Sequence, residues 1–358
     1  MNQNTNASLV LGIESSCDET AAAVIQDGRG VLANVVASQH DLHEKFGGVV
    51  PEIASRAHIE RIQPVIDEAL EKAGVTLEDL DAIAVGNRPG LIGSLLVGVT
   101  AAKTLAWATG KPLIGVDHVK AHLYAAALNN EPIEYPALGL VVSGGHTSLY
   151  ELNGPLEMSL LGRTIDDAVG EAYDKVAAIL KAGFPGGPII DKIAKEGNDQ
   201  ATDFPRSMLE GGNLDFSFSG LKTAVLYHVR GKPSGRGKQV TFQRDADDLT
   251  DAQKADVAAS FQRAAVGTLL IKLKRALKHL SSEGRRPKSL VIGGGVSANS
   301  RLREDAVEFG KRHRLDVRLP PMAYCVDNAA MIAGLAHHRL IAGQQDELDL
   351  PAVATTEL

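Results

Sequence analysis

The sequence predicts an α/β protein made of two lobes. The chain has 358 residues, more than one ordinary hydrophobic core accommodates, and this length suits two lobes of roughly 150 residues each. Apolar runs typical of strands alternate with helical periods, and the strand, polar turn and strand that begin at Leu9 have a counterpart at Leu138. We therefore expect a first lobe over residues 1–130, a second over 131–324, and a last helix, 325–342, that packs back on the first lobe.

The first lobe is expected to begin with a meander of three strands. A long helix then starts near Pro51, a residue suited to a first helical turn, and continues through Leu70. The remaining elements expected here are a strand at 80–86, a helix at 91–109, a strand at 112–116 and a short helix that starts directly after it. Ligands in open α/β sheets gather at the carboxyl ends of strands, so that last junction is a candidate for a site.

The second lobe is expected to follow a crossing at Glu131–Pro136, where two prolines interrupt all periodicity. Its expected strands lie at 138–142, at 147–152, at 289–292 and at 317–319. Its expected helices lie at 166–181, 188–196, 219–229 and 252–280, and another follows the glycine turn at 293–299. Residues 231–250 are interpreted as a mobile insertion, and residues 343–358 as a flexible tail.

His118 and His122 are the candidate metal ligands of the first lobe. On a helix, residues four positions apart lie one turn above each other on the same face, so both imidazoles can bind one ion. Such a pair alone is more often a surface or packed pair, and it needs a third ligand. Asp327, which opens the last helix, is the most suggestive distant carboxylate.

Other uses of the two histidines fit the sequence less well. The zincin pattern of metalloproteases requires Glu directly after the first His, where this chain has Val119. Structural zinc would call for a cysteine cluster, and only Cys17 and Cys325 are present. The net charge of −7 argues against nucleic-acid binding through bulk electrostatics. With no signal peptide and no apolar run of about 20 residues, we expect a cytoplasmic protein without membrane contact.

Polar and glycine-rich turns mark the other candidate positions. Glu14 and Asp18 lie in a run of hydroxyl and carboxyl side chains between two strands, which is typical of a solvated turn or of a grip on phosphate and a cation. Ser143–Gly145 and Gly293–Asn299 follow strands, and such turns expose backbone N–H groups to a phosphorylated ligand, or simply connect two elements.

Eight ordered motifs resemble one family. They are LGIESSCDET (11–20), DHVKAH (117–122), VVSGGHT (141–147), GEAYDK (170–175), FPGGP (184–188), FSFSGLK (216–222), GGGVSAN (293–299) and CVDN (325–328). Together they are similar to the universal tRNA threonylcarbamoyladenosine transferases, formerly known as O-sialoglycoprotein endopeptidases. The similarity covers residues from about Leu9 to about Gly343.

The resemblance implies the actin, sugar-kinase and Hsp70-like fold, with a nucleotide cleft between two lobes. It also implies transfer of a threonylcarbamoyl group from threonylcarbamoyl-AMP to the N6 amine of the adenosine just 3′ of the anticodon, in tRNAs that read codons beginning with A. By motif match, the metal ligands fall on His118, His122 and Asp327. The adenylate-binding positions fall on Val141, Val142, Ser143, Gly144, Gly145, Asp174, Gly187, Asp191 and Asn299.

One divalent metal ion per subunit would act as Lewis acid and template, with Fe²⁺ as the first expectation and Zn²⁺ as the alternative. Glu14 and Asp18 are the candidates for positioning the amine or taking its proton. The implied partners are tRNA, an inactive paralogue that acts as dimerisation partner, a P-loop ATPase, and a separate enzyme that makes the adenylate. The basic residues expected either to face tRNA or to be scattered over helix faces are Lys272, Lys274, Arg275, Lys278, Arg285, Arg286, Lys288, Arg312 and Arg314.

Two other functions are compatible with the same fold. An ATP-dependent small-molecule kinase would transfer phosphoryl groups and would not need His118 or His122. A nucleotide-gated chaperone or scaffold would keep its activity without the metal ligands.

Overall fold

The computed structural model describes residues 7–206, 212–235 and 241–355, which form two compact units. Unit 1 consists of Met1–Ile133, Asn153–Met158 and Arg318–Leu358, and unit 2 of Glu134–Leu152 and Ser159–Val317. The boundary between Ile133 and Glu134 lies within the crossing predicted at Glu131–Pro136. The segment that returns to unit 1 is longer than the expected helix 325–342, because it begins at Arg318 and is described through residue 355.

Unit 1 is built on a five-stranded sheet in the order β3-β2-β1-β4-β5. The predicted meander is β1 (Leu9–Glu14), β2 (Glu19–Gln26) and β3 (Gly30–Ser38), which pair antiparallel. The strands β4 (Ala82–Arg88) and β5 (Leu113–Asp117) continue the sheet parallel to β1. The carboxyl ends of β1, β4 and β5 therefore meet at one edge of the sheet, where α/β proteins place their ligands.

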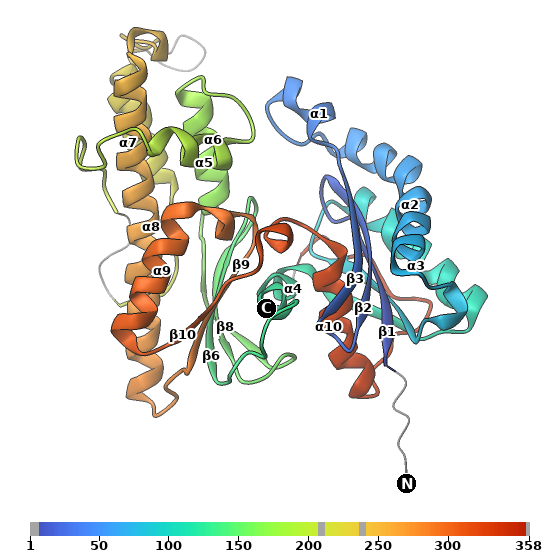
Figure 1. Ribbon diagram of the computed structural model, residues 1–358. Coiled ribbons are helices and arrows are strands. Elements are labelled where there is room, and N and C mark those ends of the chain that lie inside the picture. Colours follow the sequence, from blue (N-terminus) through green and yellow to red (C-terminus); the bar gives the residue numbers. More distant parts are fainter. Residues whose placement is uncertain (1–6, 207–211, 236–240, 356–358) are drawn as a thin grey trace. The chain divides into compact units, whose positions relative to one another are not determined.

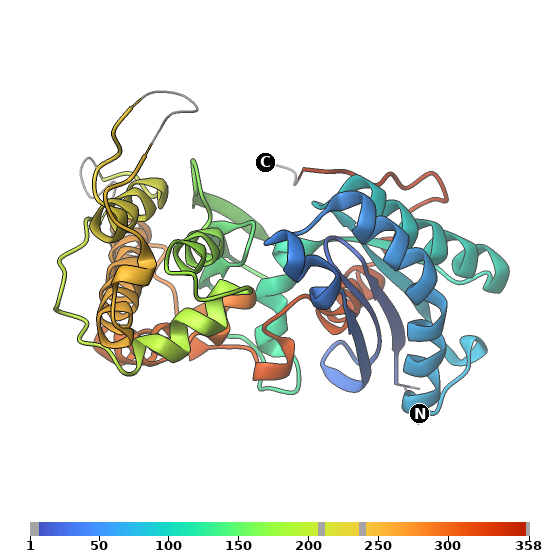
Figure 2. The same cartoon turned by 90° about the horizontal axis from the view of Figure 1, so that it is seen from above.

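Helices cover both faces of this sheet (Figures 1 and 2). On one face, α2 (Pro51–Ala73) and α3 (Ile92–Thr109) contact each other and share a core with Leu11 and Ile13 of β1. Side chains alternate along a strand, so Gly12 points to the opposite face, and a Cβ atom there would lie 2.4 Å from Ala329 O of α10 (Ala329–Ile341). The glycine therefore allows α10 to pack closely on β1.

Unit 2 repeats the architecture with the sheet order β10-β9-β6-β7-β8. Its strands are β6 (Ala137–Val142), β7 (Thr147–Leu152), β8 (Met158–Arg163), β9 (Ser289–Gly293) and β10 (Asp316–Arg318). The pair β6 and β7 is an antiparallel hairpin, and β9 lies parallel to β6. Its helices are α5 (Val169–Ile179), α6 (Gly186–Ala194), α7 (Ser219–Arg230), α8 (Asp251–Ser282) and α9 (Ser300–His313). This arrangement confirms the predicted two-lobed α/β fold.

The C-terminal segment differs from the predicted flexible tail. Asp346 N donates to Leu113 O, Val353 N donates to Asn87 O, and Leu350 is buried in the core of unit 1. An edge strand offers free backbone groups, and the tail uses Leu113 O of the edge strand β5 as well as Asn87 O near the end of β4. The prediction was wrong because the polar composition of the segment does not reveal these backbone bonds.

The predicted mobile insertion 231–250 lies partly outside the described residues. Its described part pairs Ser234 with Thr241, and Asp245 and Asp247 both form ion pairs with Lys181. Among the described residues, α3 alone is long and apolar enough to cross a membrane by length and composition, and one such helix is weak evidence for a span.

Candidate metal centre and adenylate half-site

The two histidines lie at the junction of β5 and α4 (His118–Tyr124). Asp117 ends the strand and caps the helix, because its Oδ1 accepts a hydrogen bond of 3.1 Å from Lys120 N. His118 and His122 then lie one turn apart with ring centroids separated by 4.6 Å, and both side chains are buried. The predicted helical pair is confirmed as a geometric arrangement.

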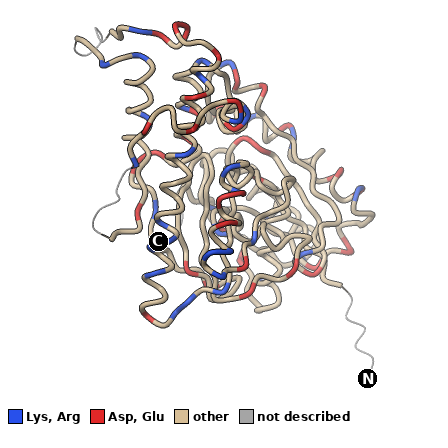
Figure 3. The backbone as a smooth tube through the Cα atoms, turned by 60° about the vertical axis from the view of Figure 1, so that its left-hand side comes forward, with Lys and Arg blue, Asp and Glu red and all other residues tan. Residues whose placement is uncertain are grey.

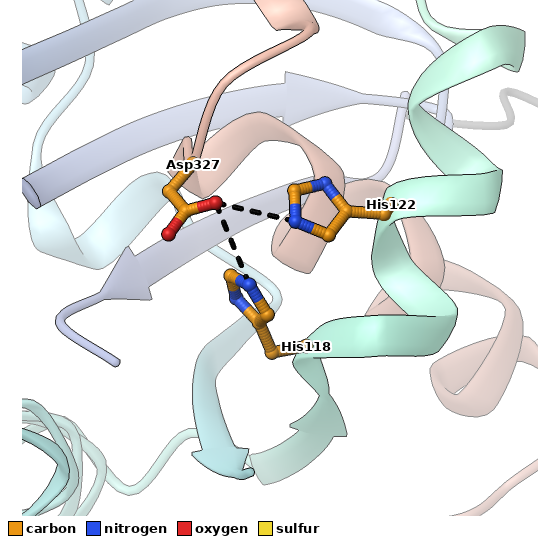
Figure 4. Close-up of side chains that lie close together, drawn as sticks. All are labelled: His118, His122 and Asp327. Atoms are coloured by element: carbon orange, nitrogen blue, oxygen red, sulfur yellow. Dashed lines mark ion pairs between the residues drawn. The ribbon is translucent and has the colours of Figure 1, made fainter. Parts of the chain in front are cut away.

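Asp327 meets both imidazoles, as Figure 4 shows. Its Oδ1 lies 3.2 Å from His122 Nε2 and 3.5 Å from His118 Nε2. The carboxylate is placed by Asn328, whose side chain caps α10 through Met331 N and also donates to Val326 O. The candidate ligand atoms of the three residues all lie within 4.8 Å of one another. The Asp327 side chain is 22% exposed, so the cluster is open on that side.

The donor set fits a divalent metal ion. Both ring nitrogens of His122 are buried and form no hydrogen bond with any residue of the described ranges. Although His122 Nε2 lies close to Asp327, the contact lacks hydrogen-bonding geometry. A buried nitrogen without a partner is destabilising, and a metal ion bound through its lone pair would satisfy it. Two imidazoles and one carboxylate also leave coordination positions open for substrate.

Glu14 lies behind His118 rather than beside Asp327. Its Oε2 is 2.9 Å from His118 Nδ1, and its Oε1 accepts from Ser16 N. A Cβ at Gly86 would lie 2.7 Å from Oε2, so the glycine of β4 provides the space that the carboxylate occupies. The side chain of Glu14 is fully buried, a position that suits orientation of the imidazole better than contact with substrate.

Charges around the cluster shift the pKa values of its members. Burial disfavours the imidazolium of His118, but the Glu14 and Asp327 carboxylates outweigh burial and raise its pKa to about 10. Burial and the neighbouring His118 lower the pKa of His122. Burial, Asp327 and Asp18 raise the pKa of Glu19 to about 9. Several carboxyl groups thus surround the cluster, and such crowding favours a bound cation.

The predicted adenylate positions of unit 2 gather at the ends of β6 and β9. Val141 and Val142 are buried in β6 and lead into the turn at Ser143, whose Oγ accepts from His146 N. A Cβ at Gly144 or Gly145 would meet nothing within 4 Å, so the turn presents open backbone to a ligand.

The start of α5 lies at this turn, and hydrogen bonds link α5 to the start of α6 and α6 to the start of α9. Gly170, in the first turn of α5, packs against the Ser143 carbonyl. A Cβ atom at Gly170 would lie only 2.5 Å from Ser143 O. Asp174 Oδ1 accepts from Gly186 N at the start of α6, and the neighbouring Gly187 is open. Asp191 accepts from Ser300 Oγ at the start of α9. Helix N-termini attract phosphate, so their convergence fits a nucleotide.

Asn299 has a structural role in this half-site. Its Oδ1 caps α9 by accepting from Leu302 N, and its Nδ2 donates to Gln262 and Tyr173. Its partners Tyr173 and Gln262, which are buried in α5 and α8, were not among the predicted positions. A motif containing Asn299 indicates the cap, but no spacing in the sequence pairs it with Gln262.

Not all of the basic residues that were considered for a tRNA-facing patch lie on the surface. Lys272 is fully buried and donates to Asn213, Arg285 forms ion pairs with Glu151 and Glu283, and Arg312 pairs with Glu308. Segments with basic residues and segments with acidic residues are interspersed over the backbone (Figure 3). These three positions therefore do not form one unpaired basic surface, since Lys272 is buried and Arg285 and Arg312 pair with carboxylates.

Comparison with known proteins identifies the fold and the family. The chain is similar to component A of the (R)-2-hydroxyglutaryl-CoA dehydratase of Acidaminococcus fermentans, with TM-score 0.50 and 13% identity over 93% of this chain and 99% of that one. It is also similar to full-length HypF, with TM-score 0.51 and 12% identity over 93% of this chain and 46% of that one. At these identities the likeness shows the fold alone.

Other proteins are much more similar to this chain in sequence than these two structures are. The tRNA N6-adenosine threonylcarbamoyltransferase of Symbiobacterium thermophilum is 52% identical over 96% of this chain and 95% of its own length. The enzyme of the same name from Rhodopirellula baltica is 51% identical over 98% of this chain and 97% of its own length. Residues 30–334 match the family model described as "TsaD: tRNA N6-adenosine threonylcarbamoyltransferase".

The two sheets with their helices define a two-lobed α/β protein with the actin, sugar-kinase and Hsp70-like fold, and unit 1 carries a candidate metal centre. The chain belongs to the tRNA N6-adenosine threonylcarbamoyltransferase family. It is therefore a tRNA-modifying transferase.

Proposed function

We propose that the protein transfers a threonylcarbamoyl group from threonylcarbamoyl-AMP to the N6 amine of the adenosine just 3′ of the anticodon, in tRNAs that read codons beginning with A. The observation that carries this proposal is the cluster of His118, His122 and Asp327 with its unsatisfied buried nitrogens, in a chain of this family. A small-molecule kinase of the same fold would have no use for that cluster.

The three residues of the cluster would hold one divalent ion, with Fe²⁺ as the first choice and Zn²⁺ as the alternative. When bound, the ion would polarise the acyl centre and stabilise the negative charge that develops on the leaving phosphate. Glu14 orients His118 so that Nε2 faces the site and Nδ1 faces the carboxylate.

Unit 2 would bind the adenylate part of the donor. The open amides of Gly144 and Gly145 and the N-termini of α5, α6 and α9 suit a phosphate, and the Asp191 carboxylate suits a ribose hydroxyl. The donor is a mixed anhydride, so AMP is the leaving group when the adenosine amine attacks the carbamoyl carbon. Val141 and Val142 anchor the turn in the core of the unit.

The attacking amine must lose a proton during the transfer. Asp18 lies in the turn after β1, is partly exposed, and acts on Cys17 and Glu19 electrostatically. Because Glu14 is buried behind His118, Asp18 is the better placed of the two to accept this proton.

The paralogous partner would dock on α2 and α3. These helices form an apolar groove of about 800 Å³, lined by residues that include Ile59, Ile62, Leu96 and Leu105. A paralogue of the same fold carries an equivalent helix pair, so the two pairs can pack with near two-fold symmetry. This use also explains why α3 is apolar although much of it is unburied in the single chain. A P-loop ATPase and a separate adenylate synthase would complete a cytoplasmic system.

Reconstitution tests the reaction. Purified protein, its partners, the adenylate synthase, L-threonine, bicarbonate, ATP and unmodified tRNA should yield the threonylcarbamoylated nucleoside, detected by mass spectrometry of digested tRNA. Asp327→Ala should lower bound metal and transfer together. Formation of only a phosphorylated small molecule would overturn the proposal, and unchanged metal content would remove Asp327 from the ligand set.

A further inference from the structure

The turn that joins β1 to β2, residues 15–18, lies beside the candidate metal centre. Ser16 Oγ of this turn is 3.2 Å from His118 Nδ1. The turn also carries Asp18, the side chain proposed above to accept the proton of the attacking amine. Whatever fixes the backbone of this turn therefore bears on the transfer reaction.

Three separate segments hold the carbonyl groups of the turn. The carbonyls on either side of Cys17 accept from backbone N–H groups, from Leu91 just before α3 at 2.8 Å and from Gln39 just after β3 at 3.0 Å. Cys17 O accepts instead from a side chain, because His58 Nε2 of α2 lies 3.0 Å from it. A single substitution can therefore release the central carbonyl of the turn.

The hydrogen bonds of His58 determine which ring nitrogen carries the proton. A carbonyl oxygen can only accept, so Nε2 donates to Cys17 O and the proton lies on Nε2. Nδ1 then accepts from Thr20 Oγ1, which is 2.8 Å away on β2. Burial lowers the pKa of His58 and so favours this neutral form. The fully buried ring thus joins the turn to the second residue of β2 with both nitrogens satisfied.

The two partners of His58 lie on either side of Asp18 in the sequence. Cys17 precedes Asp18 and Thr20 follows two residues later, so one rigid ring restrains the chain at both points. Burial, Asp18 and Asp327 raise the pKa of the Cys17 thiol, which shows that the Asp327 carboxylate is close enough to act on this turn. The restrained stretch is therefore the one that lies near the candidate metal ligand.

We propose that His58 is a positioning residue of the transfer reaction, which holds the turn so that the Asp18 carboxylate is presented to the adenosine amine. This inference rests on the proposed function, in which Asp18 accepts the amine proton. Because His58 is fully buried, it acts through the turn and not by contact with substrate. Without the ring, Cys17 O and Thr20 Oγ1 lose their partner, and the turn is free to move.

Alkylation of Cys17 by N-ethylmaleimide measures the order of the turn independently of transfer, because this thiol is partly exposed. His58→Ala should speed the alkylation by about tenfold, since a hydrogen bond to a part-buried carbonyl is lost. His58→Gln should react at nearly the wild-type rate, because its Nε2 is as many bonds from Cα as His58 Nε2 and can donate to the same carbonyl. Thr20→Val, which removes only the partner of Nδ1, should speed the alkylation to a smaller extent and covers the case of a His58→Ala variant that does not fold.

Two controls separate the turn from the rest of unit 1. Cys325 is fully buried and should stay unreactive in all variants. Val65→Ala removes a buried side chain of α2 from the core of the unit and leaves the hydrogen bonds of His58 in place. It should leave the alkylation rate of Cys17 at the wild-type value.

A double-mutant cycle then tests whether His58 acts through Asp18. His58→Ala should lower the rate constant of transfer at saturating tRNA and donor by about tenfold, with little change in KM, and His58→Gln should restore most of it. In the Asp18→Asn background the same substitution should change the rate constant by less than about twofold. A merely structural role would lower the rate constant equally in both backgrounds.

The outcomes distinguish this inference from the proposed function. Unchanged alkylation of Cys17 in His58→Ala and Thr20→Val would show that the ring does not hold the turn. Equal losses with and without the Asp18 carboxylate, or a wild-type rate constant in Asp18→Asn, would overturn the positioning role. A wild type that transfers nothing would overturn the proposed function, whereas faster alkylation in the same preparation of His58→Ala would still support the hold of His58 on the turn.

Discussion

Glu14 Oε2 lies 2.9 Å from His118 Nδ1, and both side chains are buried. A carboxylate in this position fixes the ring so that Nδ1 carries the proton and Nε2 faces Asp327. Replacing a residue that orients a metal ligand in this way typically lowers metal affinity or activity by about 10- to 100-fold. The relationship makes Glu14 a positioning residue, and this role can be measured.

Glu14→Gln should weaken metal binding by about 10- to 100-fold, because the uncharged amide oxygen is a weaker acceptor for the Nδ1 proton than a carboxylate is. Metal affinity is measured by chelator competition on the purified protein, separately from transfer. Glu60→Gln, which changes an exposed acid of α2, is the control and should leave affinity unchanged. Equal affinity in the wild type and Glu14→Gln would show that Glu14 does not position His118.

The sequence predicted the residues of the cluster better than the residues that orient them. Helical spacing pairs His118 with His122. Asp327 lies more than half the chain away, so no spacing pairs it with them; its place at the start of the last helix suggested it, and the family motifs assigned it. The position of Glu14 behind His118 depends on the space left by Gly86 on another strand, and no periodicity connects these residues. The docking of the tail on β4 and β5 was missed for the same reason, since backbone bonds leave little trace in side-chain composition.

Gly86→Ala should disturb the site, because there is no room for a Cβ atom between this position and Glu14. The new Cβ would lie 2.7 Å from Glu14 Oε2 within a buried strand, so the carboxylate or the strand must move. We expect a loss of about 1–3 kcal/mol in the free energy of unfolding, together with weaker metal binding. Chemical denaturation and chelator competition measure the two effects.

The matched control for this substitution is Gly48→Ala, because a Cβ at Gly48 would meet nothing within 4 Å. It should change neither quantity appreciably. If Gly86→Ala behaved like Gly48→Ala, the close packing of Gly86 on Glu14 would have no energetic consequence.

Ile59→Asp should abolish association with the paralogous partner while leaving the chain folded. Ile59 lines the groove between α2 and α3 and is 66% exposed, so the substitution places a charge in the proposed interface at little cost to the single chain. Ile341→Asp is the control, since Ile341 is also 66% exposed but lies on α10. Analytical ultracentrifugation with the paralogue measures both, and unimpaired association of Ile59→Asp would place the interface elsewhere.

Because of His338, the free energy of unfolding should fall when the protein is moved to mild acid. Burial, with the nearby His337 and Arg29, lowers its pKa to about 4, so the folded state binds this proton less readily than the unfolded chain does. Its contribution to stability is complete above the unfolded pKa of about 6.5 and is lost as the pH falls toward 4. Because the ring is partly exposed, we expect a loss of about 1–2 kcal/mol rather than the full value of the shift.

His338→Gln isolates this effect, because the amide takes up no proton and can still form a hydrogen bond with Tyr124 Oη, which lies 2.9 Å from His338 Nε2. Denaturant unfolding at pH 8 and at pH 4.5 gives the stability difference between the two proteins at each pH. The variant should lose less stability than the wild type on acidification. A difference that does not change between the two pH values would show that His338 takes up its proton equally in both states.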